Sequence, residues 1–238
     1  MVDRSALLAA LTATAAELPA NGSLVARLCE AARRVAGADG ASLTLTSAAA
    51  GAGTDHATRV VLWATDDVAA RLEQVLDVVG LGPASDAVRD DRALTADLLD
   101  RSGPWPAFAE MASRQTGATS LTVIPLHAGA DVLGLLSLYC AASGALVTGL
   151  DDLGFLADVI AVAVLDDALP LSPPPPGPWD ERSAIHQAAG MVMAQLAVPA
   201  PDALALLRAH AFALDLTLPE VARQVLDRTL QFRPEEGP

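Results

Sequence analysis

A run of prolines between residues 170 and 178 divides the chain. Six of these nine residues are proline, and because proline has no backbone N–H and holds φ near about −65°, neither a helix nor a sheet passes through the run. Such a run favours an extended polyproline II spacer, roughly 28 Å long at about 3.1 Å per residue. The alternative is a proline-rich ligand for an aromatic groove of a partner. We therefore expect two domains, residues 1–169 and 179–238, joined by a linker over 170–178.

The segment before the proline run alternates between helical and strand patterns. Apolar residues at three- and four-residue spacing indicate helices over 4–18, 23–36, 68–79 and 150–169. Polar–apolar alternation or short apolar runs indicate strands over 41–46, 59–63, 119–126 and 132–139, the last two joined by a hairpin over 127–131. Elements in this order predict an α+β domain in which helices pack on an antiparallel sheet.

The segment after the proline run shows helical patterns only. Three short helices are expected, over residues 180–196, 201–214 and 217–232. The third opens with Thr217-Leu218-Pro219-Glu220, which is the pattern of a capping box with a proline inside the first turn. About sixty residues in three helices predict a small all-α bundle with a limited core of its own.

The charge balance of the chain is acidic. Asp and Glu number 29 against 15 basic residues, all of them Arg, for a formal net charge of −14. This balance argues against a nucleic-acid binder driven by bulk charge and against an electrostatic membrane anchor. Apolar residues make up 52% of the chain and aromatic residues 3%, so a core is available, built mainly from Ala, Leu and Val.

Two apolar segments bear on whether the chain meets a membrane. The segment 6–20 lacks the net positive charge that precedes a signal peptide, because Asp3 stands beside Arg4. The segment 132–150 has no charge, but its glycines and hydroxyl residues are unlike those of a spanning helix. Cys29 and Cys140 are too few for a disulfide framework and are expected to be buried free thiols. We expect a cytoplasmic protein without a membrane partner.

Residue types that carry catalysis do not form a recognisable pattern. The four histidines, at 56, 127, 186 and 210, are scattered without metal-ligand spacing. The acidic pairs 66–67 and 151–152 are expected at helix starts, where negative charge offsets the helix dipole. The sequence contains no phosphate-binding glycine loop and no nucleophile motif. We expect no metal, no cofactor and no enzymatic activity.

Three motifs follow one another near the C-terminus: residues 185–193 (IHQAAGMVM), 202–208 (DALALLR) and 218–222 (LPEVA), with Ala211 and Asp215 between the last two. Over residues 180–232 this pattern resembles the ANTAR family of bacterial RNA-binding antitermination modules. Gly190 fits a physical role, since a glycine inside a helix costs about 1 kcal/mol relative to Ala and needs a reason. Close helix packing is one such reason, and closely apposed RNA is the other.

The resemblance implies a set of RNA-contacting residues and a set that holds the helices together. The expected contacts are Arg182, Gln187, Gly190, Arg208, Arg223 and Arg228, because guanidinium groups grip phosphate or stack on unpaired bases. The alternative for each Arg is a solvated or salt-bridged surface residue. The expected structural residues are Ala188, Met193, Ala203, Ala211, Leu218 and Ala222. Ala189, Gln195 and Leu204 stand where the family commonly has a lysine, an arginine and an aromatic residue.

The N-terminal part carries five short motifs in order: residues 81–87 (LGPASDA), 105–108 (WPAF), 117–121 (GATSL), 125–126 (PL) and 133–139 (LGLLSLY). This series resembles the GAF sensor domains that are often fused to ANTAR. Relatives that bind cyclic nucleotides carry an Asn-Lys-x-x-Phe-x-x-x-Asp-Glu signature, whereas this chain contains no lysine. A cyclic nucleotide is therefore not expected by that route. The ligand stays unidentified, and an empty dimerising domain is an equal alternative to a sensor.

Together the two resemblances predict a transcription antitermination regulator. The GAF-like domain would control an ANTAR-like bundle that acts as a dimer, binds paired hairpins in nascent RNA and prevents a terminator from forming. The alternative is an interaction protein whose bundle has lost RNA binding and docks a protein partner, since the segment from residue 179 has five Arg against eight Asp and Glu. DNA is not expected as a partner, because no recognition helix follows residues 218–222.

A homodimer is expected through the helix over 150–169. Leu153, Leu156, Ile160 and Val164 lie on one face of this helix at three- and four-residue spacing. An apolar face of this kind can pack on a second copy of the chain. The alternative is that the helix only covers its own sheet.

Overall fold

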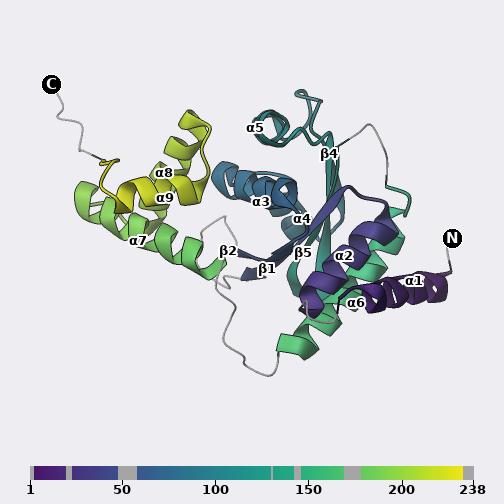
Figure 1. The fold of residues 1–238 in the computed structure, drawn as a ribbon. Helices are drawn as coiled ribbons and strands as arrows, with labels where there is room; N and C mark the ends of the chain where they lie inside the picture. Colours follow the sequence, from purple (N-terminus) through teal and green to yellow (C-terminus); the bar gives the residue numbers. More distant parts are fainter. Residues whose placement is uncertain are drawn as a thin grey trace. The chain divides into compact units, whose positions relative to one another are not determined.

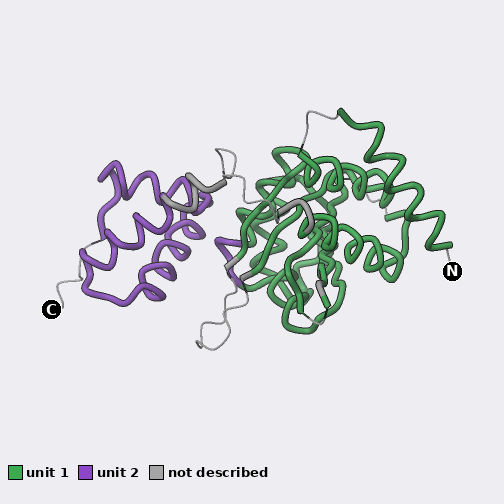
Figure 2. The backbone as a smooth tube through the Cα atoms, turned by 90° about the horizontal axis from the view of Figure 1, so that it is seen from below, with its two compact units in different colours: residues 1–76, 81–172 green, residues 77–80, 173–238 purple. Residues whose placement is uncertain are grey.

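The computed structural model describes residues 3–19, 23–47, 58–129, 131–141, 146–168 and 178–232. The chain divides into two compact units, residues 1–76 with 81–172 and residues 77–80 with 173–238 (Figure 2). The predicted linker lies outside the described residues apart from Pro178, and so does His56.

The first unit is built on an antiparallel sheet (Figure 1). Its described strands are β1 (Gly40–Ser47), β2 (Thr58–Ala64), β3 (Leu94–Asp97), β4 (Ser120–Ala128) and β5 (Asp131–Cys140), in the order β2-β1-β5-β4-β3. Every neighbouring pair is antiparallel, and β4 and β5 form the predicted hairpin. The α+β prediction is confirmed. The sequence reasoning missed β3, because four residues carry too little periodicity to stand out.

Helices cover both faces of this sheet (Figure 1). One layer contains α1 (Arg4–Glu17), α2 (Leu24–Ala36) and α6 (Leu150–Ala168), and the other contains α3 (Asp67–Val79), α4 (Pro83–Asp90) and α5 (Pro106–Thr116). The helix α2 begins where the Ser23 side chain accepts the N–H of Ala26, and ends where Gly37 adopts φ 71°. These are the ordinary start and stop of a helix, so local chemistry sets its length. The helices α4 and α5 were not predicted; each opens with a proline in its first turn.

Gly134 on β5 shows why one motif residue has no side chain. A Cβ built at this position would collide with the carbonyl oxygen of Thr44 on the neighbouring strand β1. The two strands pair with Leu45 opposite Gly134. The glycine is therefore required by the close approach of the two backbones.

The predicted dimer face of α6 is used inside the chain. Leu153, Leu156 and Ile160 are 0% exposed and Val164 is 7% exposed, within the core that α6 shares with the sheet and with α1 and α2. The interface drawn from these four residues is therefore wrong, and the alternative, that this face covers its own sheet, holds. Helical periodicity identifies an apolar face but not which surface covers it.

The second unit contains α7 (Pro178–Leu196), α8 (Ala200–Leu214) and α9 (Leu218–Leu226). The helical prediction is confirmed, but α9 ends six residues before the predicted end at Phe232. Asp227 closes the helix, and Arg228 then takes a positive φ of 59° that a helix does not continue through. Within the described residues, no single helix is long and apolar enough to cross a membrane. One pair, 184–196 with 200–214, meets the length and composition criteria together but is bent by 105°.

Candidate functional site

The core of the second unit is made mainly of small aliphatic side chains. Five of the six residues predicted to hold the helices together are buried and one, Met193, is half-buried; the buried ones are Ala188, Ala203, Ala211, Leu218 and Ala222. Val192, Leu207, Val221 and Val225 complete the contact, each 0% exposed. Alanine at these positions lets the helices approach closely, so this small core orients the exposed faces of the bundle.

The turn between α8 and α9 is set by local hydrogen bonds. Asp215 adopts φ 58° and its N–H donates to the carbonyls of Ala211 and Phe212, which ends α8. The Thr217 hydroxyl accepts the N–H of Glu220 at 3.3 Å, and Glu220 Oε2 accepts the N–H of Thr217 at 2.7 Å. The predicted capping box is therefore confirmed, and it fixes where α9 begins.

An uncharged exposed face runs along α7. His186, Gln187, Gly190 and Ala194 are all exposed, and their spacing places them on one side of the helix. A Cβ built on Gly190 would meet no atom within 4 Å among the described residues. Helix packing inside the described chain therefore does not explain this glycine.

The predicted arginine contacts are spread over the three helices. Arg223 lies exposed on α9, Arg228 lies exposed in the turn after it, and Arg208 on α8 is half-buried. Arg182 belongs to the first part of α7, and its side chain lies outside the described residues. Gln187 and Gly190 share the exposed face of α7.

The segment after α9 folds back on the bundle, which the sequence analysis did not foresee. Gln195 Oε1 on α7 accepts the backbone N–H of Phe232 at 2.9 Å, and the Phe232 ring packs edge-on against His210 of α8 with the ring centroids 5.6 Å apart. Gln195 stands where similar sequences commonly have an arginine. It therefore serves this segment by accepting a hydrogen bond, which an arginine side chain cannot do.

The first unit holds a buried polar cluster between its sheet and α3. Glu73 on α3 is 1% exposed, and its Oε1 accepts hydrogen bonds from Ser42 Oγ at 2.7 Å and Ser137 Oγ at 2.8 Å. Its Oε2 lies 3.1 Å from Nη1 of Arg59 on β2, whose side chain is 9% exposed. Arg59 Nη2 also donates to the Glu73 carbonyl at 3.3 Å. The cluster compensates its own charge, as a buried ion pair must.

The sequence carries a signal for this cluster in the spacing of Glu73 on α3. Glu73 falls three and four residues from Leu76 and Ala69, both buried on the face of α3 that packs inward. A charge at that spacing within an apolar face indicates a buried carboxylate that needs a partner. The pattern does not say which strand supplies the cation.

Asp66 ties the start of α3 to the sheet. Its Oδ1 accepts the N–H of Ala69 at 2.8 Å and the hydroxyl of Tyr139 on β5 at 3.2 Å. Burial, reinforced by the negative charge of Asp66, raises the pKa of Tyr139 to about 12. The pair 66–67 therefore lies at a helix start, as predicted, and 151–152 lies in the first turn of α6.

The two thiols of the chain are buried. Cys29 and Cys140 are both free and buried, as predicted. Burial, with the negative charge of Glu30 next in importance, raises the pKa of the Cys29 thiol far above its usual range. Because the thiolate is the reactive form, Cys29 is not suited to nucleophilic chemistry.

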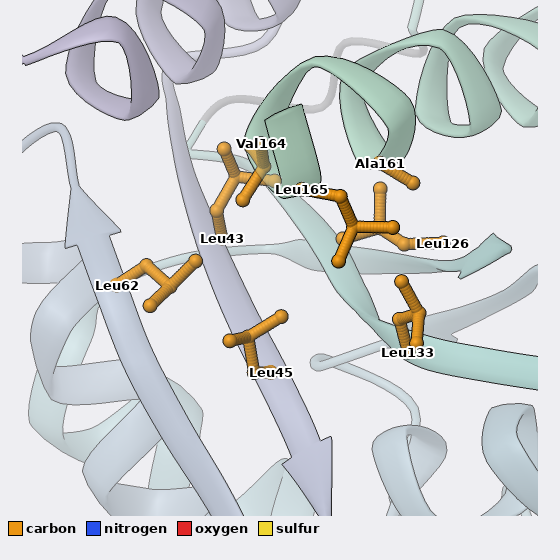
Figure 3. A pocket seen from close by; sticks show the side chains of 8 residues that line it. All are labelled: Leu43, Leu45, Leu62, Leu126, Leu133, Ala161, Val164 and Leu165. Atoms are coloured by element: carbon orange, nitrogen blue, oxygen red, sulfur yellow. The ribbon is translucent and has the colours of Figure 1, made fainter. Parts of the chain in front are cut away.

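An apolar hollow lies between the sheet and the end of α6 (Figure 3). Eight aliphatic side chains line it: Leu43, Leu45, Leu62, Leu126, Leu133, Ala161, Val164 and Leu165. Among the described residues, no polar side chain that would orient a ligand lines the hollow, whereas small-molecule sites generally combine apolar walls with a few placed polar groups. The hollow is therefore not taken as the functional site. Among the described residues, no group of three or more potential ligands could hold a metal ion.

An α+β unit followed by a three-helix unit is the class that these observations define. A GAF domain model matches residues 22–165, and an ANTAR domain model matches residues 179–226. The chain belongs to the GAF family and carries an ANTAR domain after it. Both are sensor and regulatory domains rather than catalytic ones, so at family level the chain is a sensor-linked regulator of the ANTAR type.

The structural comparisons give weak overall likenesses. The GAF-B domain of DevS from Mycobacterium smegmatis is 20% identical, and the match covers 70% of this chain and 97% of that chain with a TM-score of 0.37. The phycoerythrobilin-bound GAF domain of a cyanobacterial phytochrome is 13% identical, covering 71% of this chain and 98% of that chain with a TM-score of 0.39. The comparison with curated proteins finds no match.

Proposed function

We propose that the chain is an antitermination regulator whose ANTAR domain binds RNA hairpins, with the exposed face of α7 around Gly190 as the centre of contact. The carrying observation is Gly190 itself. It lies exposed inside a helix, costs about 1 kcal/mol of helix stability relative to Ala, and serves no packing within the described chain. A bare backbone at this position allows a nucleic-acid strand to approach the helix closely.

Arginines on α9 supply the charge for this contact. Arg223 and Arg228 are exposed on α9 and in the turn after it, and each phosphate contact adds affinity that falls with salt. The segment from residue 179 has five Arg against eight acidic residues, a net charge of −3. Binding therefore relies on a few positioned guanidinium groups and on stacking with unpaired bases of a hairpin loop. We expect the logarithm of affinity to fall only shallowly with the logarithm of salt concentration.

In this proposal two bundles of a homodimer hold paired hairpins, and the paired hairpins prevent a terminator from forming. Since the inner face of α6 is occupied by the sheet, the dimer uses its outer face, where Val162 is 55% exposed. Val162→Glu should leave a monomer by light scattering while wild type is a dimer. A monomeric wild type over the whole concentration range would end the dimer proposal.

The experiment for RNA binding compares two glycines. Gly190→Ala on α7 is measured beside Gly154→Ala on α6, because a Cβ at either position meets nothing within 4 Å and both lie inside helices. Each substitution should stabilise its helix by about 0.5–1 kcal/mol. The probe is a labelled RNA with two tandem hairpins, titrated in mobility-shift assays at several salt concentrations.

The two variants should separate stability from binding. Gly190→Ala should bind the two-hairpin RNA with an affinity at least about tenfold lower than that of wild type, which is a loss of about 1.4 kcal/mol in binding free energy. Gly154→Ala should bind with the affinity of wild type. Arg223→Gln should lower the salt slope by about 0.7 to 1. Equal binding of Gly190→Ala and wild type would show that α7 is not the contact face.

A second candidate is that the bundle docks a protein. Phe212 and Leu214 at the end of α8 are 45% and 52% exposed, and exposed large apolar side chains are typical of protein-binding surfaces. Two results together would favour this candidate. The wild-type protein would bind no hairpin RNA at low salt, and a protein partner that binds wild type would no longer bind Phe212→Ser.

A further inference from the structure

His127 links three elements of the first unit through its imidazole ring. It lies at the end of β4, where the pairing with β5 shifts register between Leu126 and His127. Nδ1 lies 2.7 Å from Asp158 Oδ1 on α6, and Nε2 lies 2.6 Å from Asp91 Oδ1. The register shift is the kind of irregularity that re-aims a side chain.

Asp91 is the residue that ends α4, and its backbone is unusual. It adopts φ 49° and ψ 50°, and its N–H donates to the carbonyl of Ala87. A residue other than glycine in the left-handed region carries a conformational cost, which Asp tolerates better than most. The bond to His127 therefore holds a turn that has little intrinsic preference for its conformation.

The two short contacts require a charged ring. Both ring nitrogens face carboxylate oxygens, and only the imidazolium form has an N–H on each nitrogen. A neutral ring keeps one N–H and turns a lone pair toward the other carboxylate. Asp158 Oδ1 also accepts the backbone N–H of His127 at 3.3 Å, so Asp158 keeps a donor in either state, whereas within the described part of the chain Nε2 is the donor that reaches the Asp91 carboxylate.

We propose that His127 is a pH-sensitive clamp that holds the end of α4 and the middle of α6 against β4 when protonated, and releases Asp91 when it loses its proton. The charged groups that face the ring are Asp91 from α4 and Asp158 from α6. Nη2 of Arg92, the next residue after Asp91, lies 3.6 Å from Asp90 Oδ2. On the hairpin, Asp131 of β5 pairs with Ala128 of β4. The hydrogen bond to Asp91, ahead of the bond to Asp158, raises the pKa of His127, which moves the release to a higher pH.

The clamp gives the sensor domain an input that does not require a small-molecule ligand. The change falls on the turn at Asp91 that ends α4, whereas Asp158 on α6 keeps the backbone N–H of His127. This inference concerns the first unit alone and does not depend on RNA binding.

The test is an NMR and hydrogen-exchange titration of the full chain. His127→Gln mimics the neutral ring, since Gln donates hydrogen bonds but cannot take up the positive charge. Asp91→Asn removes one carboxylate while keeping a residue that tolerates a positive φ, and Asp158→Asn removes the other. His186→Gln, a substitution at an exposed histidine of α7, is the matched control. The readouts are the pKa of His127 and the exchange rate of the Arg92 amide, which donates to Ala87 O at 3.3 Å.

The clamp predicts a specific pattern at each pH. Below the pKa of His127, the Arg92 amide of His127→Gln should exchange about three- to tenfold faster than that of wild type and of His186→Gln. A change of this size is what the loss of one charged hydrogen bond between partly exposed groups should produce. Above that pKa, wild type should match His127→Gln. Asp91→Asn and Asp158→Asn should each lower the pKa of His127. Equal exchange in wild type and His127→Gln at every pH, or an unchanged pKa in both Asn variants, would overturn the clamp.

Discussion

Replacing Glu73 by Leu should strongly destabilise the first unit. Glu73 is 1% exposed and Arg59 9% exposed, with 3.1 Å between Oε2 and Nη1. Removing one partner of a buried ion pair costs about 3–5 kcal/mol, because the other charge stays in a low-dielectric site. The hydroxyls of Ser42 and Ser137 also lose their acceptor, at about 1 kcal/mol or more each. These terms approach the whole free energy of unfolding of an ordinary domain.

Two further variants separate the terms. Glu73→Gln keeps an oxygen for the serines and loses only the charge, so it should be about 2 kcal/mol more stable than Glu73→Leu. Arg59→Met with Glu73→Leu removes both charges, and an apolar pair in a buried site is often as stable as the ion pair it replaces. The double variant should therefore unfold later than Glu73→Leu alone. Arg101→Met, in an exposed pair with Glu110 at 3.3 Å, should cost under about 1 kcal/mol.

The assay is urea unfolding followed by tryptophan fluorescence. In a Trp179→Phe background the remaining tryptophans, Trp63 and Trp105, belong to the first unit, so the signal reports that unit alone. Free energies come from linear extrapolation, and the four combinations at positions 59 and 73 form a double-mutant cycle. If the effects of the two single substitutions simply add in the double variant, Arg59 and Glu73 are not coupled and the reasoning is refuted.

Three other substitutions or conditions test the fold. Gly134→Ala should destabilise the first unit by several kcal/mol, about 2 or more, because its Cβ meets the Thr44 carbonyl; thermal unfolding close to that of wild type would contradict the close approach. Thr217→Ala should cost the second unit about 0.5–2 kcal/mol through loss of the cap on Glu220 N–H, measured by urea unfolding followed by circular dichroism, with an unchanged midpoint counting against it. Because the pKa of His127 is raised in the folded state, its stabilising contribution should be complete below the unfolded pKa of about 6.5 and lost as pH rises through the folded pKa; a His127→Gln variant whose stability keeps the same pH dependence as wild type would disprove this.

Local patterns were enough to predict much of the architecture. The helices α1, α2, α3 and α6 and the longer strands of the first unit follow from periodicity, which acts over a few residues. The three helices of the second unit and the capping box at Thr217 follow from periodicity and cap chemistry. The ANTAR and GAF motifs predicted both families. Short or polar elements were missed, including β3 and α5, because four to eleven residues with mixed polarity do not produce a clear period.

Tertiary structure alone decided which surfaces and charges meet. The apolar face of α6 is identical in the sequence whether it covers a sheet or a second copy, and only packing shows that Leu153 and Ile160 are already buried. The hydrogen-bond partners of Glu73 lie 14 to 64 residues away along the chain. Those of His127 lie 31 to 36 residues away. Periodicity reports which side of an element is apolar, whereas contacts between distant residues depend on how the chain closes its loops and on the space that its neighbours leave. The sequence by itself therefore determined the class of domains, and the packed structure determined the ion pair, the histidine clamp and the open backbone at Gly190.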